Sequence, residues 1–211
     1  SGSKWPFYSD SNITVNEARK CKQAYYACIS FVDAQIGRII NTLQHNNLID
    51  DTLIVVWSDH GYFLGEKGLW YKRKNFERSL RVPLIIAGGG ISPQSQACKQ
   101  PVELLDLYPT IVDYTGYEVP SILEGESLVP LLNDPLFDWD RPAISQVIHS
   151  RGEAYGFSLR TERWRYTEWK KGAAGRELYD HTNDPEEVKN LAMNPKYALL
   201  VKRLSDQLKP Y

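Results

Sequence analysis

A short stretch of the sequence combines the side-chain types from which a metal site can be built. The apolar run Thr52–Trp57 leads directly into Ser58, Asp59, His60 and Gly61. A carboxylate and an imidazole can share one divalent cation if the chain bends after the strand, and a glycine permits that bend. Taken alone, the same residues also suit a turn that carries a surface histidine, so both interpretations stay open at this point.

Further polar side chains follow the Asp-His pair. Lys72 supplies an ammonium group that can hold an oxyanion, with a solvated surface lysine as the competing interpretation. Tyr62 is a candidate for the wall of a substrate pocket, and packing in the core or at its rim fits it equally well. Glu66 suits either a partner for His60 or a charge in the loop.

Other charged and aromatic residues are assigned to structure rather than to chemistry. We expect Asp50 and Asp51 in a turn before the strand, at the end away from the site. Three histidines outside the stretch are expected on the surface: His45, His149 and His181. Three residues of a predicted hairpin could approach an anionic sugar, although a structural ion pair is favoured: Arg160, Trp164 and Arg165.

A long amphipathic helix is predicted ahead of the Asp-His pair. Apolar residues recur at steps of three and four between about Asn16 and Leu43, which is the helical period. Asn12 or Thr14 can cap this helix. Cys21 and Cys28 lie on one of its faces, and we expect them to be buried free thiols.

Two short apolar runs predict buried strands around the candidate site. The first is Thr52–Trp57 and the second is Val82–Ala87, and a helical pattern follows from Val102 to Tyr114. Continuous apolar runs are typical of strands that are buried on both faces. The order helix, strand, loop, strand, helix predicts an α/β layered sheet with parallel strands.

The pattern changes after about residue 135. Four strands are predicted, followed by a helix, at Pro142–Ile148, Tyr155–Arg160, Trp164–Trp169, Glu177–Tyr179 and Tyr197–Leu208. Closely spaced strands of this kind form a small antiparallel sheet that one helix covers. We therefore divide the chain into an α/β part, residues 1–135, and a smaller α+β part, residues 136–211.

Composition and charge exclude two classes of partner. Of the 211 residues, 42% are hydrophobic and 24% are charged, which is ordinary for a globular chain with a sizeable core. A net charge of -1 gives no overall field for nucleic acid or an anionic membrane. No apolar run approaches the roughly 18 residues of a membrane-spanning helix. We expect neither a nucleic-acid partner nor a transmembrane segment.

The stretch from Ser58 to Lys72 closely resembles a motif of the type I sulfatases of the alkaline phosphatase superfamily. It is most similar to the iduronate-2-sulfatase-like branch, whose members carry Ser-Asp-His-Gly-x-x-Leu-Gly-Glu-x-Gly-x-Trp-x-Lys, then Asn-Phe and a Val-Pro-Leu-Ile strand. Further segments resemble the family in the same order along the chain: Tyr25–Arg38, Leu104–Thr110, Tyr155–Thr161, Arg165–Thr167 and Glu177–Asp180.

The resemblance implies a role for each candidate residue. It makes Asp59 and His60 metal ligands and Lys72 a contact to the sulfate group, with Tyr62 and Lys67 as further substrate contacts. Lys67 stands where relatives often have histidine. The implied metal is calcium, although the nitrogen of His60 does not by itself select calcium over zinc or manganese. A divalent ion and a lysine can stabilise the charge that develops on a sulfate ester during hydrolysis.

The nucleophile that the resemblance implies has no counterpart in this sequence. Sulfatases of this type use a formylglycine made from Cys or Ser within Cys/Ser-x-Pro-x-Arg. Neither a serine nor any of Cys21, Cys28 and Cys98 has that context, and the N-terminal Asp-Asp strand end with further ligands is absent too. The sequence therefore predicts the C-terminal part of a sulfatase, inactive alone and completed by an N-terminal portion that carries the formylglycine.

Two other functions remain open at this point. A phosphatase or phosphodiesterase of the same superfamily would use Asp-His ligation with a Ser or Thr nucleophile. A non-catalytic remnant would bind a sulfated sugar or a partner without turnover. For the sulfatase, the expected substrate is a sulfated sugar, with uronate, hexosamine and simple aryl sulfates all open. The resemblance also implies a periplasmic, secreted or lysosomal location.

Overall fold

The computed structural model describes residues 13–91, 96–149 and 154–211. The described residues form two compact units. One contains the residues up to Lys72 together with Arg81–Ile91, and the other contains Arg73–Leu80 together with the residues after Ile91. The division predicted at residues 135 and 136 stays a prediction. In the described part of the chain, no helix is both long enough and apolar enough to cross a membrane.

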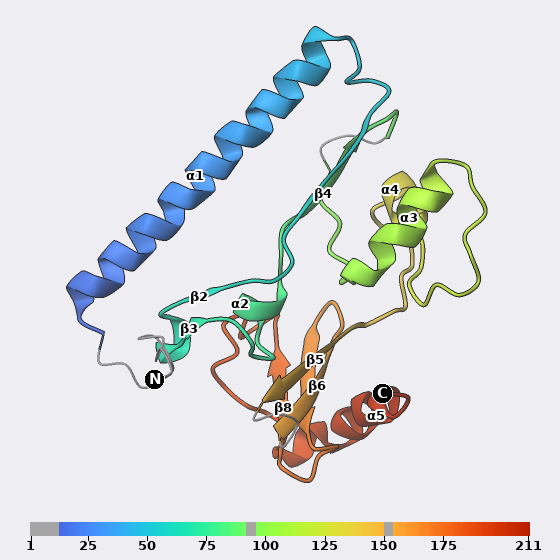
Figure 1. The fold of residues 1–211 in the computed structure, drawn as a ribbon. Helices are drawn as coiled ribbons and strands as arrows, with labels where there is room; N and C mark the ends of the chain where they lie inside the picture. Colours follow the sequence, from blue (N-terminus) through green and yellow to red (C-terminus); the bar gives the residue numbers. More distant parts are fainter. Residues whose placement is uncertain (1–12, 92–95, 150–153) are drawn as a thin grey trace. The chain divides into compact units, whose positions relative to one another are not determined.

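The first unit begins with the predicted long helix, α1 (Val15–His45) (Figure 1). Thr14 is its N-cap: the hydroxyl of Thr14 accepts from the Glu17 amide at 3.3 Å, and the Glu17 carboxylate accepts from the Thr14 amide at 2.8 Å. The alternative cap, Asn12, lies outside the described residues. This reciprocal capping box satisfies two amides that a helix start otherwise leaves unpaired.

Helix α1 has no buried residue, although its sequence is apolar on more than one side. Tyr26, Ile29 and Phe31 are all exposed. Cys28 is exposed as well, so the prediction of two buried thiols is wrong for Cys28, and Cys21 is half-buried. A helix that is apolar on several sides is normally covered by other elements. The described part of the first unit does not supply such a cover.

Strands β1 (Leu53–Trp57) and β4 (Leu84–Gly88) pair with each other in a two-stranded sheet. Their register places Trp57 opposite Leu84, and the pairing is antiparallel. The prediction of parallel strands is therefore wrong for this pair. A continuous apolar run does not give strand direction, and the connection between these strands lacks the long crossover helix that parallel neighbours usually need. The prediction of buried strands is also wrong here, because no residue of β1 or β4 is buried and Trp57 and Ile85 are exposed.

A small hairpin lies in the connection between β1 and β4. Strands β2 (Phe63–Leu64) and β3 (Trp70–Tyr71) pair antiparallel, with the turn η1 (Glu66–Gly68) between them. Phe63 is fully buried and anchors the hairpin. Gly65 begins the turn with φ +107°, and a Cβ there would come within 3.3 Å of the Trp70 ring, so a glycine suits this position best.

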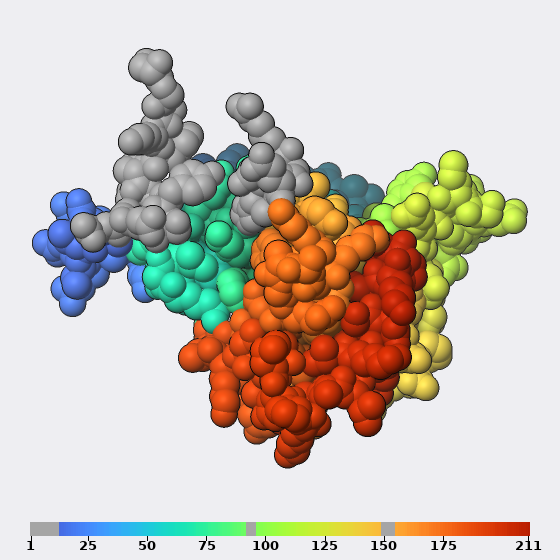
Figure 2. All heavy atoms as spheres, turned by 90° about the horizontal axis from the view of Figure 1, so that it is seen from below, coloured from blue at the N-terminus to red at the C-terminus, as the bar shows by residue number. Residues whose placement is uncertain are grey.

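The second unit contains the predicted antiparallel sheet. Its strands follow one another in sequence order: β5 (Ala143–His149), β6 (Ala154–Arg160), β7 (Trp164–Trp169) and β8 (Arg176–Asp180). Helix α5 (Ala198–Leu208), preceded by the turn η4 (Pro195–Tyr197), supplies Leu204 and Leu208 to the core of this sheet. In Figure 2 the orange and red C-terminal residues form one continuous body. The predicted small sheet with a covering helix is confirmed.

The remaining elements of the second unit are short: α2 (Glu77–Leu80), η2 (Leu104–Asp106), α3 (Leu107–Tyr114) and α4 (Val129–Asn133). Asp106 organises this region from a buried position. Its carboxylate accepts from the amides of Glu103 and Glu126, each at 2.9 Å, and lies 3.4 Å from Arg141. A buried carboxylate needs such partners because desolvation penalises its charge.

Candidate functional site

The candidate metal ligands lie immediately after β1. The chain bends there as predicted, and the Ser58 hydroxyl donates to the His60 carbonyl oxygen at 3.0 Å across the bend. This bend brings the His60 Nε2 atom to 3.5 Å from the Asp59 Oδ2 atom. The Asp59 side chain is 83% exposed, whereas that of His60 is half-buried. A carboxylate oxygen and an imidazole nitrogen therefore face one place, and the carboxylate is open to solvent.

The two ring nitrogens of His60 have different surroundings. Nδ1 lies 2.8 Å from the carbonyl oxygen of Gly61. A carbonyl only accepts, so Nδ1 donates to Gly61, and Nε2 is the ring nitrogen that faces Asp59 and Lys72. This arrangement, in which one nitrogen donates to a backbone carbonyl and the other is left as a donor atom for a ligand, is usual for metal-bound histidine.

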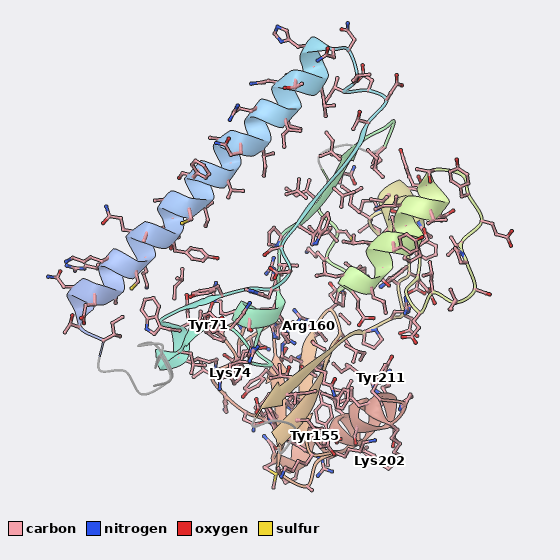
Figure 3. The ribbon with its side chains drawn as sticks, viewed as in Figure 1. Tyr71, Lys74, Tyr155, Arg160, Lys202 and Tyr211 are labelled. Atoms are coloured by element: carbon pink, nitrogen blue, oxygen red, sulfur yellow. The ribbon has the colours of Figure 1, made fainter. Side chains whose placement is uncertain are left out.

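Lys72 reaches the same place from the end of the β2–β3 hairpin. Its ammonium group contacts the Nε2 atom of His60. The ammonium also lies 5.6 Å from the centre of the Tyr71 ring, within the range of a cation–π interaction. Tyr71 is labelled in Figure 3 beside the hairpin. The structure thus brings together Asp59, His60 and Lys72, although twelve residues separate the last two.

Tyr62 lies in a cluster of tyrosine rings within the first unit. Its ring centre is 5.3 Å from that of Tyr25 on α1 and 5.7 Å from that of Tyr71. Burial, followed by the neighbouring tyrosine hydroxyls, raises the pKa of Tyr62. Because Tyr71 contacts both Tyr62 and Lys72, this aromatic cluster extends to the ammonium group.

Glu66 and Lys67 occupy the turn of the hairpin. The Glu66 carboxylate accepts from the Leu64 amide at 2.6 Å. This contact agrees with one of the two interpretations, in which Glu66 is a charge in the loop. Lys67 is exposed and has a left-handed backbone, with φ +55°. The structure does not test whether Tyr62 and Lys67 contact a substrate, and these roles stay predictions.

The donor set suits part of a divalent metal site. Asp59 offers a hard oxygen, and His60 offers its Nε2 atom, because Nδ1 is the nitrogen that bonds to Gly61. Calcium takes six to eight oxygen ligands, from side chains, backbone carbonyls or waters, so a calcium ion here would need further oxygen ligands besides this pair. The lone pair on His60 Nε2 can serve either the Lys72 ammonium or a cation. At this place the described residues therefore offer two ligand atoms and one neighbouring ammonium.

The predicted hairpin residues have structural roles in the second unit. Arg160 and Arg165 pair with Glu77, as the favoured interpretation proposed. Trp164 packs edge-on against Tyr197, with ring centres 5.6 Å apart. The guanidinium of Arg163 lies 4.6 Å from the Trp164 ring centre. These contacts account for Arg160, Trp164 and Arg165 without a sugar ligand.

The predictions for the three histidines outside the motif have different outcomes. His45 is exposed, as expected, and the side chain of His149 lies outside the described residues. The prediction for His181 is wrong: its side chain is 7% exposed, and its Nε2 atom lies 3.0 Å from Glu187. Glu77 and Glu187 were missed entirely. The partners of Glu77 are 88 and 110 residues away in the sequence, so no local spacing reveals them.

Comparisons with known proteins show the family of this chain. The profile of the sulfatase family matches residues 6–117, and that of the C-terminal part of N-sulphoglucosamine sulphohydrolase matches residues 65–211. The chain belongs to the sulfatase family. Solved structures of sulfatases, which belong to the alkaline phosphatase superfamily, share the fold of this chain. BT1596, a 2-O GAG sulfatase, matches 94% of this chain with a TM-score of 0.84 at 29% identity.

The names of individual relatives refer to different substrates. A choline-sulfatase from Rhizobium meliloti is 36% identical over 192 residues, and arylsulfatase K from Mus musculus is 35% identical over 188 residues. These matches cover 90% and 85% of this chain but 36% and 34% of the relatives. The 2-O GAG sulfatase is covered to 44%. The chain thus spans about a third of the length of these curated relatives.

Proposed function

We propose that this chain is the C-terminal part of a sulfatase that hydrolyses the sulfate ester of a sugar. In this proposal Lys72 contacts the sulfate group, and Asp59 and His60 supply two ligands of a divalent metal site, with calcium as the proposed ion. One observation carries the proposal: within a sulfatase-family segment, the Lys72 ammonium, the His60 Nε2 atom and the Asp59 carboxylate converge on one place.

The side chains of this chain suit the handling of a sulfate ester. The Lys72 ammonium can hold a non-bridging sulfate oxygen as negative charge grows on it, which lowers the barrier if the ammonium is already in position. The Nδ1–H bond to Gly61 fixes the tautomer and the orientation of the His60 ring. A divalent cation, when bound, withdraws charge from the sulfate oxygens. Asp59 would balance the charge of that cation.

An N-terminal portion of the same enzyme is the proposed partner. The formylglycine motif is absent from the sequence, and the chain spans only about a third of its curated relatives. The exposed apolar side chains of α1 and the two-stranded β1–β4 sheet support this, because isolated two-stranded sheets are marginal in water. We also propose that the chain alone is inactive, and that the complete enzyme is periplasmic, secreted or lysosomal.

The proposed substrate is a 2-O-sulfated uronate sugar, in line with an iduronate-2-sulfatase-like enzyme. The similarity to BT1596, a 2-O GAG sulfatase, supports this choice. The structure of BT4656 in complex with D-glucosamine-2-N,6-O-disulfate, 31% identical with a TM-score of 0.75, points to amino-sugar sulfates instead. The choline-sulfatase points to a small cationic alcohol. These relatives define the panel of substrates to test.

The test is turnover of that panel by the complete protein that contains this chain. Replacing Lys72 by alanine should lower kcat/KM for the best sulfate ester about 100- to 1,000-fold, because one transition-state contact is lost. Lys202, on helix α5 of the second unit (Figure 3), is the matched control, since it is exposed and pairs only weakly with Asp206 at 3.2 Å. Equal rates for Lys72→Ala and Lys202→Ala would refute the role of Lys72.

One observation favours a second candidate function. A phosphonate monoester hydrolase from Silicibacter pomeroyi is 31% identical and matches 94% of this chain with a TM-score of 0.81. A metal site beside a lysine would equally hold a phosphonate or phosphate ester, since these groups also carry negative oxygens. Adding a phosphonate monoester and a phosphate diester to the panel separates the candidates, because the sulfatase proposal predicts a higher kcat/KM for sulfate esters.

A further inference from the structure

Within the described residues, the Lys72 ammonium has two contacts, and neither of them is a carboxylate. The ammonium touches the Nε2 atom of His60, and it lies over the ring of Tyr71, 5.6 Å from the ring centre. A lysine ammonium sits on a flexible four-carbon stem and occupies many positions unless something confines it. Because His60 Nε2 is also the proposed metal ligand, a cation bound there would leave the Tyr71 ring as the described contact of the ammonium.

The backbone of Tyr71 is fixed at the end of the hairpin. Tyr71 is the last residue of β3, and it pairs with Phe63 of β2, which is fully buried. Tyr71 also has φ +80°, a conformation that residues with a Cβ rarely adopt and that persists only when surrounding contacts impose it. A positive φ changes the direction in which the side chain leaves the backbone. The hairpin therefore sets where the Tyr71 ring can lie.

The Tyr71 ring is braced by two further tyrosines of the first unit. It meets Tyr62 edge to face, with ring centres 5.7 Å apart and ring planes at 78°. Tyr62 in turn lies 5.3 Å from Tyr25 on α1, and the side chains of Tyr62 and Tyr25 are both half-buried. Such ring pairs attract one another beyond the effect of the area that they bury. The three rings form a row that begins at α1 and ends at the Lys72 ammonium.

The contact between Tyr71 and Lys72 is a cation–π interaction of modest strength. The face of an aromatic ring carries partial negative charge and attracts an ammonium within roughly 6 Å of the ring centre. Tyr71 is 40% exposed, so water weakens this attraction. At exposed sites it changes an equilibrium constant about two- to fivefold. The attraction depends on the ring face and not on the tyrosine hydroxyl.

We propose that Tyr71, braced by Tyr62 and Tyr25, is a positioning residue for Lys72. Its ring face holds the ammonium beside His60 and ready to meet a sulfate oxygen. This inference rests on the proposed function, because it assigns importance to where the Lys72 ammonium lies. Loss of the ring face should leave the charge of the ammonium intact but let the group move, and a small misplacement at a reacting group is costly.

Three other roles for Tyr71 make different predictions. A residue that only packs the hairpin needs apolar bulk, which leucine largely supplies. A residue that binds substrate through its hydroxyl needs tyrosine itself, so phenylalanine would fail. A ring that stacks on the substrate would act whether or not Lys72 is present. The positioning role instead needs an electron-rich ring and the ammonium together.

The experiment varies position 71 in the complete protein that contains this chain. The variants are Tyr71→Phe, Tyr71→Leu and a series in which the phenylalanine ring carries one, two or three fluorine atoms. Fluorine withdraws charge from the ring face and nearly preserves the shape of the ring, so the series weakens the cation–π interaction in steps. Tyr117→Leu is the matched control, because Tyr117 is 75% exposed and belongs to the second unit.

Two quantities are measured for every variant: kcat/KM for the best sulfate ester, and the Kd of inorganic sulfate by calorimetry, which requires no turnover. We expect Tyr71→Phe and Tyr117→Leu to match the wild-type protein in both. Tyr71→Leu should lower kcat/KM and raise the Kd about two- to fivefold. Each added fluorine should move both quantities further in the same direction.

The fluorine series is then repeated in the Lys72→Ala background. Without the ammonium, the sulfate Kd and the residual kcat/KM should not depend on the number of fluorine atoms, because the two interacting groups are no longer both present. A dependence that persists would mean that the ring acts on the substrate or on the fold, and it would overturn the inference.

The inference is also overturned if Tyr71→Leu matches Tyr71→Phe, if Tyr71→Phe falls as far as Tyr71→Leu, or if the fluorine series has no effect. If Tyr71→Leu does not fold, the fluorine series alone decides. Lys72→Ala separates this result from the proposed function. If Lys72→Ala leaves kcat/KM unchanged, the proposed role of Lys72 and this inference fail together. If Lys72→Ala lowers kcat/KM as predicted but fluorine has no effect, only the role of Tyr71 is rejected.

Discussion

At the residue scale, the sequence could reveal the candidate ligands because they are neighbours in the chain. Asp59 and His60 adjoin each other directly after a strand. Lys72 was assigned to the same site only through the resemblance to sulfatases, and in the structure a short hairpin returns it there. The contacts of Glu77 could not be found in this way. Glu77 meets Arg165 across 88 residues and Glu187 across 110 residues, and such pairs depend on the assembled fold.

A residue-scale prediction concerns Asp180 and pH. Two hydrogen bonds from Arg163, at 2.7 and 2.9 Å, lead the contacts that lower the pKa of this carboxyl from 3.8 to about 2. A carboxyl whose pKa is lowered by folding adds stability above its unfolded pKa, and this stability is lost as the pH falls through its folded pKa. We therefore expect Asp180 to stabilise the fold above about pH 4 and to lose that effect towards pH 2.

Urea unfolding of the wild-type protein and Asp180→Asn between about pH 2 and about pH 6 checks this, because that range covers both the unfolded pKa of 3.8 and the folded pKa of about 2. The difference between the two midpoints should be largest near pH 6 and should shrink as the pH falls. Asp140→Asn, at an exposed position, is the control and should show no such trend. A constant difference for Asp180→Asn would mean that the carboxylate charge does not contribute.

At the element scale, local patterns predicted the C-terminal sheet well and the central strands only in part. The hairpin of β6 and β7 was predictable because a polar turn separates two alternating segments that pair with each other. The antiparallel direction of β1 and β4 was not predictable, because a continuous apolar run carries no information about strand direction. The same limitation explains why the prediction for Cys28 is wrong. The helical period predicts a covered face but does not say which part of the protein covers it.

An element-scale prediction concerns helix α5 and its contact with the sheet. Leu204 is 1% exposed and packs with Leu159, Tyr166 and Leu178. Leu204→Ala should lower the free energy of unfolding by about 2–5 kcal/mol, because it removes buried contacts and leaves a cavity. Leu199→Ala, at a position on the same helix that is 85% exposed, should change it by less than about 0.5 kcal/mol.

Chemical denaturation of both variants measures the difference. Equal effects at Leu204 and Leu199 would show that α5 does not cover the sheet in solution. A change only at Leu204 would agree with the packing of α5 against β6 and β7. Within the same unit, β6 and β7 also carry Gly156 and Arg165, which contact Asn75 and Glu77.

At the scale of the whole molecule, the chain has the properties of a part rather than of a complete enzyme. It belongs to the sulfatase family, yet it spans about a third of its curated relatives and contains no formylglycine motif. Its long helix leaves apolar side chains exposed, and its central sheet has two strands. The family and these uncovered surfaces lead to one account, in which an N-terminal portion supplies the nucleophile and the missing ligands.

The most direct test of this account is a crystal structure of the complete protein, grown with calcium and inorganic sulfate. The account predicts one cation bound by the Asp59 carboxylate and the His60 Nε2 atom, with a sulfate oxygen within roughly 3 Å of the Lys72 ammonium. The formylglycine from the N-terminal portion should face the same sulfate. A cation and a sulfate bound elsewhere, with Asp59, His60 and Lys72 contacting neither, would contradict it.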